Sequence, residues 1–358
     1  MEPYILKQSV GIDVSKDSLS ICLCTLLSDL SRSYDYLEDQ PNNINGFKRI
    51  CSWLNKHQGE GVHLVVLLEA TGVYHERLAE YLYASCVSVS IMQSGRVKRY
   101  AQSLDQRSKT DLLDSKMLAM LAIERPLKEW SPPSDTLRKL KGLSRERSVL
   151  ITERGMLRNR RHAIEEGSYV NKQSMRRYAK RQKMLNTQIK EIEAEMQTLV
   201  AGDKELSSKI AYLQSIPGIS FIASATVVGE TLGFSNITNA KQLTSYVGYD
   251  VVQRESGNYK GKTKISKKGN KQIRAILHMP SMAAIRVNPT LKPFYQRLKS
   301  SKVKPIIGLV ATQRKLLLLM YTLWKKEENY DPEIAQKKAT SLKELAAQDS
   351  QLKHQLTS

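Results

Sequence analysis

The feature that most constrains the fold is an unbroken apolar run. Residues 64–68 read Leu-Val-Val-Leu-Leu, with no polar side chain on either face, and the run ends at Glu69 before a loop that contains Gly72. A run of this kind is typical of a strand that is buried on both faces of its sheet. It predicts a mixed α/β core in which Glu69 closes a central strand.

The neighbouring segments predict the rest of this domain. Three alternating segments within residues 4–37 favour an antiparallel meander, because the links between them are short and polar. Helical spacing follows in residues 42–54 and 78–82, and another short strand is predicted at residues 87–92. The expected order is three strands, helix, strand, helix and strand.

Asp13 occupies the first predicted strand. Val10, Ile12 and Val14 alternate along it, so Gly11 and Asp13 fall on the opposite face. Aspartate is disfavoured inside strands, so its position calls for a reason. It is either a turn-capping residue at a strand end or a functional carboxylate.

Two more carboxylates, Asp111 and Asp114, begin a later helix. Thr110 is a suitable N-cap for this helix, and an apolar stripe follows it. Residues three apart share one face of a helix, so these two carboxylates repel each other unless solvent or a cation separates them. The alternative is ordinary acidic charge that complements the helix dipole.

The composition favours a polyanionic partner. The 358 residues include 56 Lys and Arg against 35 Asp and Glu, a net charge of +21, which suits nucleic acid or an anionic membrane surface. No apolar run reaches the ~20 residues that span a bilayer. The best candidate, residues 306–323, is interrupted by Arg314 and Lys315 and is interpreted as a buried or amphipathic helix. We therefore expect a cytoplasmic, nucleoid-associated protein with no membrane partner.

The middle of the chain, residues 134–212, predicts a helical coiled coil for assembly and nucleic-acid contact. Leucine or isoleucine recurs every seven residues in its first half, and three-four spacing follows a break near Gly167. The bend is crowded with basic residues that form either a solvated face or, because few acids offset them, a contact for the phosphate backbone. These residues are Arg158, Arg160, Arg161, Lys172, Arg176, Arg177, Lys180 and Arg181.

Residues 213–330 form a third region. It opens on Pro217-Gly218, which resembles either a helix-hairpin-helix that contacts a phosphate or a plain packing turn between helices. Farther on, glycines and basic residues interleave in a loop that suits phosphate, with a disordered basic loop as the alternative. The lysines in this loop are Lys262, Lys264, Lys267 and Lys268. A charged tail, residues 331–358, follows.

The carboxylates Asp13, Glu69, Asp111 and Asp114 are the candidates for chemistry. Strand ends and a neighbouring helix can bring such groups together above a sheet. Carboxylates clustered without His or Cys suit Mg²⁺ or Mn²⁺. Two such ions about 4 Å apart promote phosphodiester cleavage. The basic composition makes nucleic acid the expected substrate.

Several motifs together resemble those of the IS110 (IS-one-ten) family of insertion-sequence transposases, whose relatives include Piv-type invertases. They occur in the expected order over about residues 8–325. They are Gly11-Ile12-Asp13-Val14-Ser15-Lys16, Leu68-Glu69-Ala70-Thr71-Gly72, Lys109-Thr110-Asp111-Leu112-Leu113-Asp114, Ser256-Gly257, Ile265-Ser266-Lys267-Lys268-Gly269-Asn270 and Arg274.

The resemblance implies a fold and a reaction. Residues 1–128 would form a RuvC-like, RNase H-type α/β domain whose four carboxylates bind Mg²⁺. A mostly α-helical C-terminal transposase domain would supply a serine that becomes covalently linked to DNA, and its Ser-Gly motif corresponds to Ser256. Ser266 is a rival for this role, and its alternative is a helix cap.

The resemblance also implies partners. The family uses an element-encoded bridge RNA that pairs with donor and target DNA, and its active complex resembles a tetramer. We expect a homo-oligomer here, a dimer or a tetramer. Two other functions remain open: a metal-dependent RuvC-like junction nuclease that uses water as nucleophile, and a non-catalytic nucleic-acid-binding protein.

Overall fold

The computed structural model describes residues 3–70, 72–104, 108, 110–253, 255–256, 259–261, 263–301 and 304–333. The chain forms two compact units, Met1–Pro132 and Pro133–Ser358. We describe each unit by itself.

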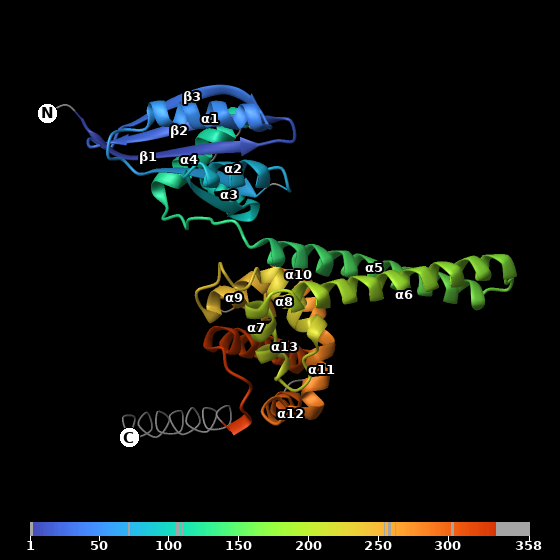
Figure 1. Cartoon of the computed structure of the whole chain (residues 1–358). Coiled ribbons are helices and arrows are strands. Elements are labelled where there is room, and N and C mark those ends of the chain that lie inside the picture. The colour runs from blue at the N-terminus through green and yellow to red at the C-terminus, as the bar shows by residue number, and fades with distance from the viewer. Residues whose placement is uncertain are drawn as a thin grey trace, which may run out of the picture. The chain divides into compact units, whose positions relative to one another are not determined.

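The first unit is built on a five-stranded mixed sheet with the order β3-β2-β1-β4-β5 (Figure 1). The first three strands are antiparallel neighbours, whereas β4 and β5 run parallel to β1. This confirms the predicted meander and the α/β class. The strands are β1 (Ile5–Val14), β2 (Ser18–Leu27), β3 (Arg32–Pro41), β4 (Leu64–Ala70) and β5 (Ser88–Gln93).

Helices cover both faces of this sheet. Two of them pack on the face of Val10, Ile12 and Val14, where their side chains form one apolar core with the strands. The other two pack on the opposite face, over Leu67 and Met92. The first pair is α1 (Ile44–His57) and α2 (Glu76–Ala84), and the second pair is α3 (Ser94–Ser103) and α4 (Asp111–Glu124).

Small residues allow α4 to lie very close to β1. A Cβ atom on Gly11 would collide with the backbone of Ser115 and Ala119 in α4. Next to it, the Ser9 hydroxyl donates to the Ala119 carbonyl at 2.7 Å. Cys22 on β2 is also buried against this helix. The alternation seen in the sequence therefore separates a bulky core face from a face of small residues that receives α4.

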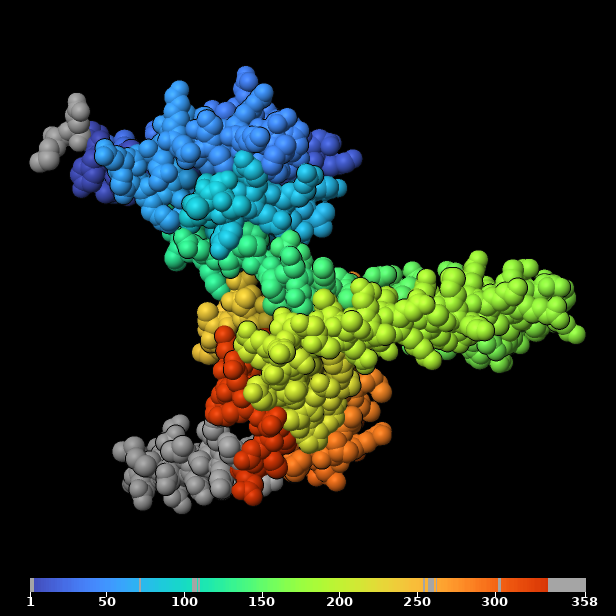
Figure 2. All heavy atoms as spheres, in the orientation of Figure 1, coloured from blue at the N-terminus to red at the C-terminus, as the bar shows by residue number. Residues whose placement is uncertain are grey.

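The second unit is mostly helical and contains two short β-ribbons, β6–β9 and β7–β8. Its two longest helices form a hairpin that extends from the rest of the unit (Figure 2). The helices are α5 (Asp135–Glu165), α6 (Lys172–Ala201), α7 (Lys204–Gln214), α8 (Phe221–Thr231), α9 (Ala240–Val247), α10 (Lys271–Ile276), α11 (His278–Val287), α12 (Leu291–Ser301) and α13 (Pro305–Lys326). The ribbon strands are β6 (Val251–Val252), β7 (Glu255–Ser256), β8 (Tyr259–Lys260) and β9 (Lys264–Ile265).

The base of the hairpin shares its core with the C-terminal helices. Leu140 of α5 and Met196 of α6 are buried in the same apolar cluster as residues of α8 and α13. The long helices that the sequence predicts are therefore present. Their coiled-coil role and the limits of the three predicted segments stay predictions.

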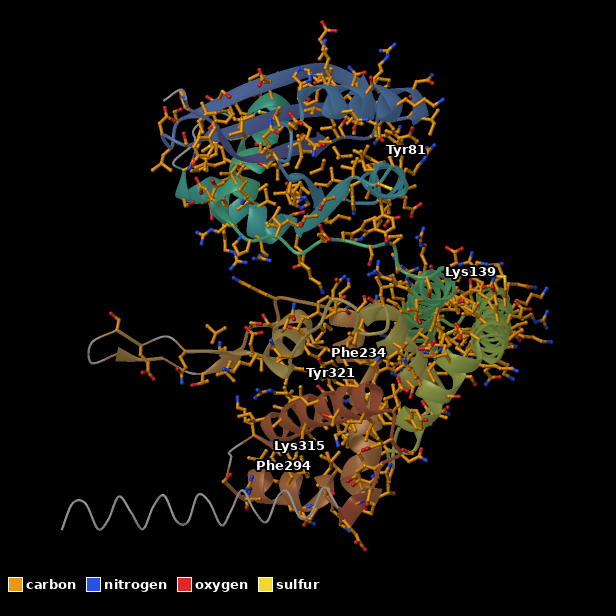
Figure 3. All side chains as sticks on the ribbon, turned by 60° about the vertical axis from the view of Figure 1, so that its left-hand side comes forward. Tyr81, Lys139, Phe234, Phe294, Lys315 and Tyr321 are labelled. Atoms are coloured by element: carbon orange, nitrogen blue, oxygen red, sulfur yellow. The ribbon has the colours of Figure 1, made fainter. Side chains whose placement is uncertain are left out.

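Helix α13 contributes to this core. Among the described residues it is the one helix long and apolar enough to cross a membrane by length and composition. Its residues Leu316, Leu317 and Met320 are fully buried in the unit, as expected of a core helix. At its sides, the Tyr321 ring lies 5.4 Å from that of Phe234, and Lys315 lies over the ring of Phe294 (Figure 3).

The Pro217-Gly218 turn joins α7 to α8. Gly218 has a positive φ of 100°, and a Cβ atom there would approach the Ala284 backbone nitrogen of α11 to 2.7 Å. The turn is thus packed against protein, which favours the plain packing turn over a phosphate-binding hairpin.

Candidate active site

Asp13 and Glu69 lie at the same end of two adjacent parallel strands. The last registered pair between β1 and β4 is Ile12 with Leu68, so the next position on each strand is the carboxylate. Neighbouring strands are about 4.8 Å apart, and side chains alternate between faces. Asp13 and Glu69 therefore belong to the face of Gly11 and Leu67, on which α4 packs.

The first turn of α4 lies beside the same end of β1. The Lys7 ammonium donates to the Ile123 carbonyl at 2.6 Å, and Gly11 lies against Ser115. Helix α4 thus runs opposite to β1, and each step of two residues along the strand moves about one turn back along the helix. Continuing this progression from Gly11 brings Asp13 to the start of α4, the turn that contains Asp111.

Thr110 determines where α4 begins. Its side chain accepts a hydrogen bond from the Leu113 backbone N–H, which confirms the predicted N-cap. The first turn contains Asp111, which is exposed, and Asp114, which is half-buried. Acidic residues at this end of a helix complement its dipole, so this effect and a functional role are compatible.

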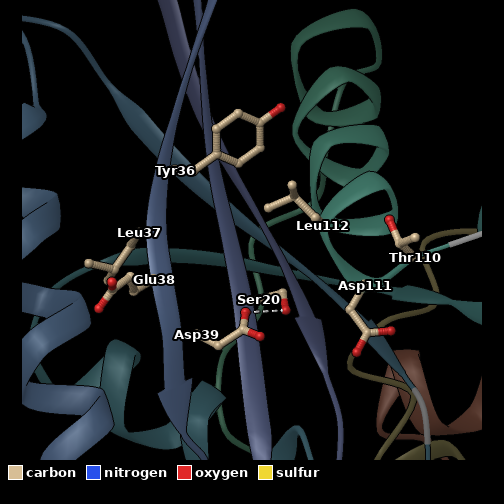
Figure 4. A pocket seen from close by; sticks show the side chains of 8 residues that line it. All are labelled: Ser20, Tyr36, Leu37, Glu38, Asp39, Thr110, Asp111 and Leu112. Atoms are coloured by element: carbon tan, nitrogen blue, oxygen red, sulfur yellow. Dashed lines mark hydrogen bonds between the residues drawn. The ribbon is translucent and has the colours of Figure 1, made fainter.

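A pocket of about 680 Å³ lies between the start of α4 and strands β2 and β3 (Figure 4). Inside it, the Ser20 hydroxyl donates to the Asp39 carboxylate at 2.6 Å. Ser20 is also the cross-strand partner of Asp13. The residues around the pocket are Ser20, Tyr36, Leu37, Glu38, Asp39, Thr110, Asp111 and Leu112.

Asp39 is a pocket residue that the sequence did not predict. It lies on β3, and the register between β2 and β3 shifts between Leu19 and Ile21. Such a shift changes which side chains share a face, so alternation along β3 does not show that Asp39 reaches Ser20. The run of acids at residues 38–39 was the available signal.

The donor set at this end of the sheet suits a hard cation. Its carboxylate oxygens are the ligands that Mg²⁺ and Mn²⁺ prefer. Within the described part of the chain, however, no three acidic, histidine or cysteine side chains are close enough to hold one ion. Mg²⁺ is usually held by one or two carboxylates together with substrate phosphates, so the chemistry of these residues fits a metal that binds with the substrate.

Two groups near the pocket remain protonated at neutral pH. Burial raises the pKa of the Tyr36 phenol to about 12, and the neighbouring Cys22 thiol adds to this effect. Burial likewise raises the pKa of Cys22 to about 12. The aromatic wall of the pocket is therefore uncharged. The negative charge of the pocket comes from its carboxylates alone.

Ser256 belongs to the second unit. It lies in β7, opposite Tyr259 of β8, and is exposed. The ribbons form an arm that extends away from the helices (Figure 3). An exposed serine on such an arm is accessible to a polymeric substrate. Gly257, the second residue of the Ser-Gly motif, lies outside the described residues.

Ser266 has a different environment. Its hydroxyl donates to the Asp250 carboxylate at 2.7 Å, at the base of the arm. The expectation that Ser266 caps the next helix is wrong, because the Asn270 side chain accepts from the backbone N–H groups of Gln272 and Ile273 at the start of α10. Asn270 takes this position because it directly precedes the helix.

A buried carboxylate fixes the base of the arm. Glu230 of α8 is 1% exposed, and the Arg145 guanidinium donates to both of its oxygens, at 2.8 and 3.2 Å. The Asn270 amide donates to the same carboxylate at 2.7 Å. Glu230 therefore ties the arm to α5 and α8. The sequence does not predict this role, because the partner Arg145 is 85 residues away in the chain.

The predicted basic contacts are mostly exposed. Seven of the eight at the hairpin are exposed, whereas Arg161 is half-buried and donates to Glu165 at 2.9 Å. Arg158 and Arg161 also line a groove of about 420 Å³ near the bend. In the arm, Lys264, Lys267 and Lys268 are exposed. Lys262 lies outside the described residues.

Comparison with known proteins places both parts of the chain in one family. A DEDD-type IS110 transposase model matches residues 10–170, and a model described as "Transposase IS116/IS110/IS902 family" matches residues 210–296. The "Pilin gene-inverting protein" of Moraxella lacunata is 28% identical over 338 residues, covering 92% of this chain and 99% of that protein. Its counterpart in Moraxella bovis is 27% identical over 335 residues, covering 92% and 99%.

The solved structures that match part of the chain include RuvC. Thermus thermophilus RuvC is 13% identical, with a TM-score of 0.26 over 34% of this chain and 99% of RuvC. The two family models, which match both units of the chain, name one family, and the Moraxella proteins align with nearly its whole length. The chain therefore belongs to the IS110 family of transposases.

Proposed function

We propose that this transposase cuts and rejoins the DNA of an insertion sequence with Ser256 as the nucleophile and Mg²⁺ held by Asp13, Glu69, Asp111 and Asp114. Mn²⁺ is the alternative ion. The observation that supports the proposal is the register of the first unit, which puts Asp13 and Glu69 at the same end of β1 and β4, with α4 packed on β1 at Gly11 and with Asp111 and Asp114 in its first turn.

The proposed reaction divides the chemistry between the two units. When bound, Mg²⁺ would withdraw charge from the scissile phosphate. The Ser256 oxygen loses its proton and attacks phosphorus, the bond from phosphorus to a deoxyribose oxygen breaks, and that oxygen takes up a proton and leaves as a hydroxyl, so that the DNA is joined to the serine. This link retains the energy of the phosphodiester, so rejoining to a second strand needs no ATP. The exposure of Ser256 supports this role.

The basic residues supply the nucleic-acid contacts in this proposal. The exposed lysines and arginines of the hairpin and the arm hold the backbones of donor DNA, target DNA and an element-encoded bridge RNA. Base pairing with that RNA then selects the sequence, and the protein reads shape and charge. The active species is a homo-oligomer, a dimer or a tetramer, that works in the cytoplasm on nucleoid DNA.

The test is recombination between donor and target plasmids, with and without RNA transcribed from the flanks of the gene. We expect recombination only with the RNA, and none with Asp13→Ala or Ser256→Ala. Ser266→Ala is the matched control and keeps activity. Recombination without RNA would contradict the proposed role of a guide RNA and would favour direct recognition of DNA by the protein.

The same variants separate the other functions. Metal-dependent cutting that survives in Ser256→Ala indicates a junction nuclease that activates water. Binding without any chemistry indicates a nucleic-acid-binding protein. Recombination that survives in Asp13→Ala would contradict the proposed metal site.

A further inference from the structure

The pocket beside Asp13 combines surfaces that the proposed reaction does not use. Tyr36 and Leu112 present apolar surface on one side of it, and they are 42% and 47% exposed. On the other side the Asp39 carboxylate faces the pocket, with one oxygen accepting from Ser20 (Figure 4). An uncharged aromatic wall thus faces a negatively charged one.

The charge of this pocket disfavours a phosphate. Glu38, Asp39 and Asp111 all line it, and a phosphate entering it would meet three carboxylates. A nucleobase is uncharged, its flat face stacks on aromatic and apolar side chains, and its amino groups donate to carboxylates. The pocket is also within the volume range of about 300–1,000 Å³ that is typical of small-ligand sites.

The position of the pocket indicates which nucleotide of the DNA would place its base there. Ser20 is the cross-strand partner of Asp13, and Asp111 belongs both to the pocket lining and to the proposed metal ligands. A scissile phosphate held through Mg²⁺ at Asp13 and Asp111 would place the base of an adjoining nucleotide at the mouth of this pocket.

We propose that this pocket binds a nucleobase of the DNA strand that is being cut, next to the scissile phosphate. The base stacks on Tyr36 and Leu112, and its exocyclic amino group donates to Asp39. This inference rests on the proposed function. It predicts a preference for a base with an amino group over thymine, which lacks one.

Fluorescence of 2-aminopurine tests the proposal without chemistry. The probe is placed at each position flanking the cleavage site of the donor DNA and bound by full-length Ser256→Ala protein with the flank RNA and Mg²⁺. Stacking on an aromatic ring quenches this base. We expect quenching at one position to be lost in Tyr36→Ala and kept in Tyr36→Phe. Tyr83→Ala, a change of a tyrosine that is 44% exposed on α2 over the opposite face of the sheet, is the matched control.

A cutting assay supplies the second readout. Removing the base at the quenched position should slow cutting about tenfold, in line with the stacking energy of one base. Tyr36→Ala should slow cutting of the intact substrate by a similar factor. It should not slow cutting of the abasic substrate any further. Asp39→Asn should reduce the preference for an amino-bearing base over thymine.

Three outcomes would overturn the proposal: no position responding to Tyr36→Ala, equal losses in Tyr36→Phe and Tyr36→Ala, or quenching only when the probe is in the RNA. Failure of the proposed function is distinguishable, because it appears as undiminished cutting in Ser256→Ala or Asp13→Ala. The quenching measurement does not depend on cutting.

Discussion

Gly11 lies directly beneath α4, and its lack of a side chain determines how closely the helix approaches the sheet. A Cβ atom there would meet backbone atoms of Ser115 and Ala119, which have no freedom to rotate away. The same close approach aligns the start of α4 with Asp13. A change at this residue therefore affects both the stability of the first unit and the proposed metal site.

Gly11→Ala should lower the free energy of unfolding of the first unit by about 1–3 kcal/mol, because overpacking forces the helix away from the strand. Gly142→Ala is the matched control: it lies inside α5 with nothing within 4 Å of its added Cβ. That change should stabilise the second unit by about 0.5–1 kcal/mol, because alanine has a higher helix propensity than glycine. Urea unfolding measures both, and equal effects would contradict the close approach.

His75 provides a pH dependence at the residue scale. It is buried before α2, its Nδ1 atom has no hydrogen-bond partner among the described residues, and burial lowers its pKa. When the pH is below about 6.5, the ordinary pKa of histidine, the imidazole of the unfolded chain binds a proton that the imidazole of the folded chain does not. The first unit should therefore lose stability as the pH falls below about 6.5 and the imidazole protonates on unfolding.

The measurement is urea unfolding at a pH above and a pH below that value. His75→Gln should reduce the loss, whereas His63→Gln should not, because the His63 side chain is 67% exposed. A pH dependence that is unchanged in His75→Gln would contradict this origin.

At the scale of elements, the arm that bears Ser256 depends on Glu230. Its carboxylate receives Arg145 from α5 and Asn270 from the end of the arm, so it joins three segments. Asn270 also caps α10. Loosening this junction should change where the arm lies without altering Ser256 itself.

Glu230→Gln should destabilise the second unit by about 1–3 kcal/mol, because it leaves buried donors poorly paired. The half-exposed Arg145 places the expected value toward the lower end of this range. The matched control is Glu193→Gln, which breaks an ion pair with Arg147 at a site where the glutamate side chain is 30% exposed. Unfolding that is no more affected by Glu230→Gln than by Glu193→Gln would contradict the role of the junction.

The elements also show how far the sequence predicts the structure. Alternation and the unbroken apolar run predicted the strands of the first unit, because these patterns reflect burial on each face. Asp39 and Glu230 escaped prediction, since one depends on a shift in strand register and the other on a partner 85 residues away in the chain. The helix-cap alternative for Ser266 is wrong, because Asn270 directly precedes α10 and caps it.

At the scale of the whole molecule, the net charge of +21 should make binding to nucleic acid depend steeply on salt. Replacing Arg176, Arg177, Lys180 and Arg181 by alanine should weaken binding and reduce the slope of log affinity against log salt by about 0.9 for each phosphate that is no longer neutralised. Fluorescence anisotropy at several salt concentrations measures the slope. A slope that stays unchanged would contradict binding of the nucleic-acid backbone at the hairpin.

The most direct measurement is the capture of a covalent protein–DNA adduct. Full-length protein, flank RNA, Mg²⁺ and donor DNA are combined, denatured and digested, and the DNA-linked peptide is identified by mass spectrometry. The proposed mechanism predicts DNA attached to Ser256, and no adduct in Asp13→Ala. Attachment to Ser266, or cutting by the Ser256→Ala protein without any adduct, would contradict it.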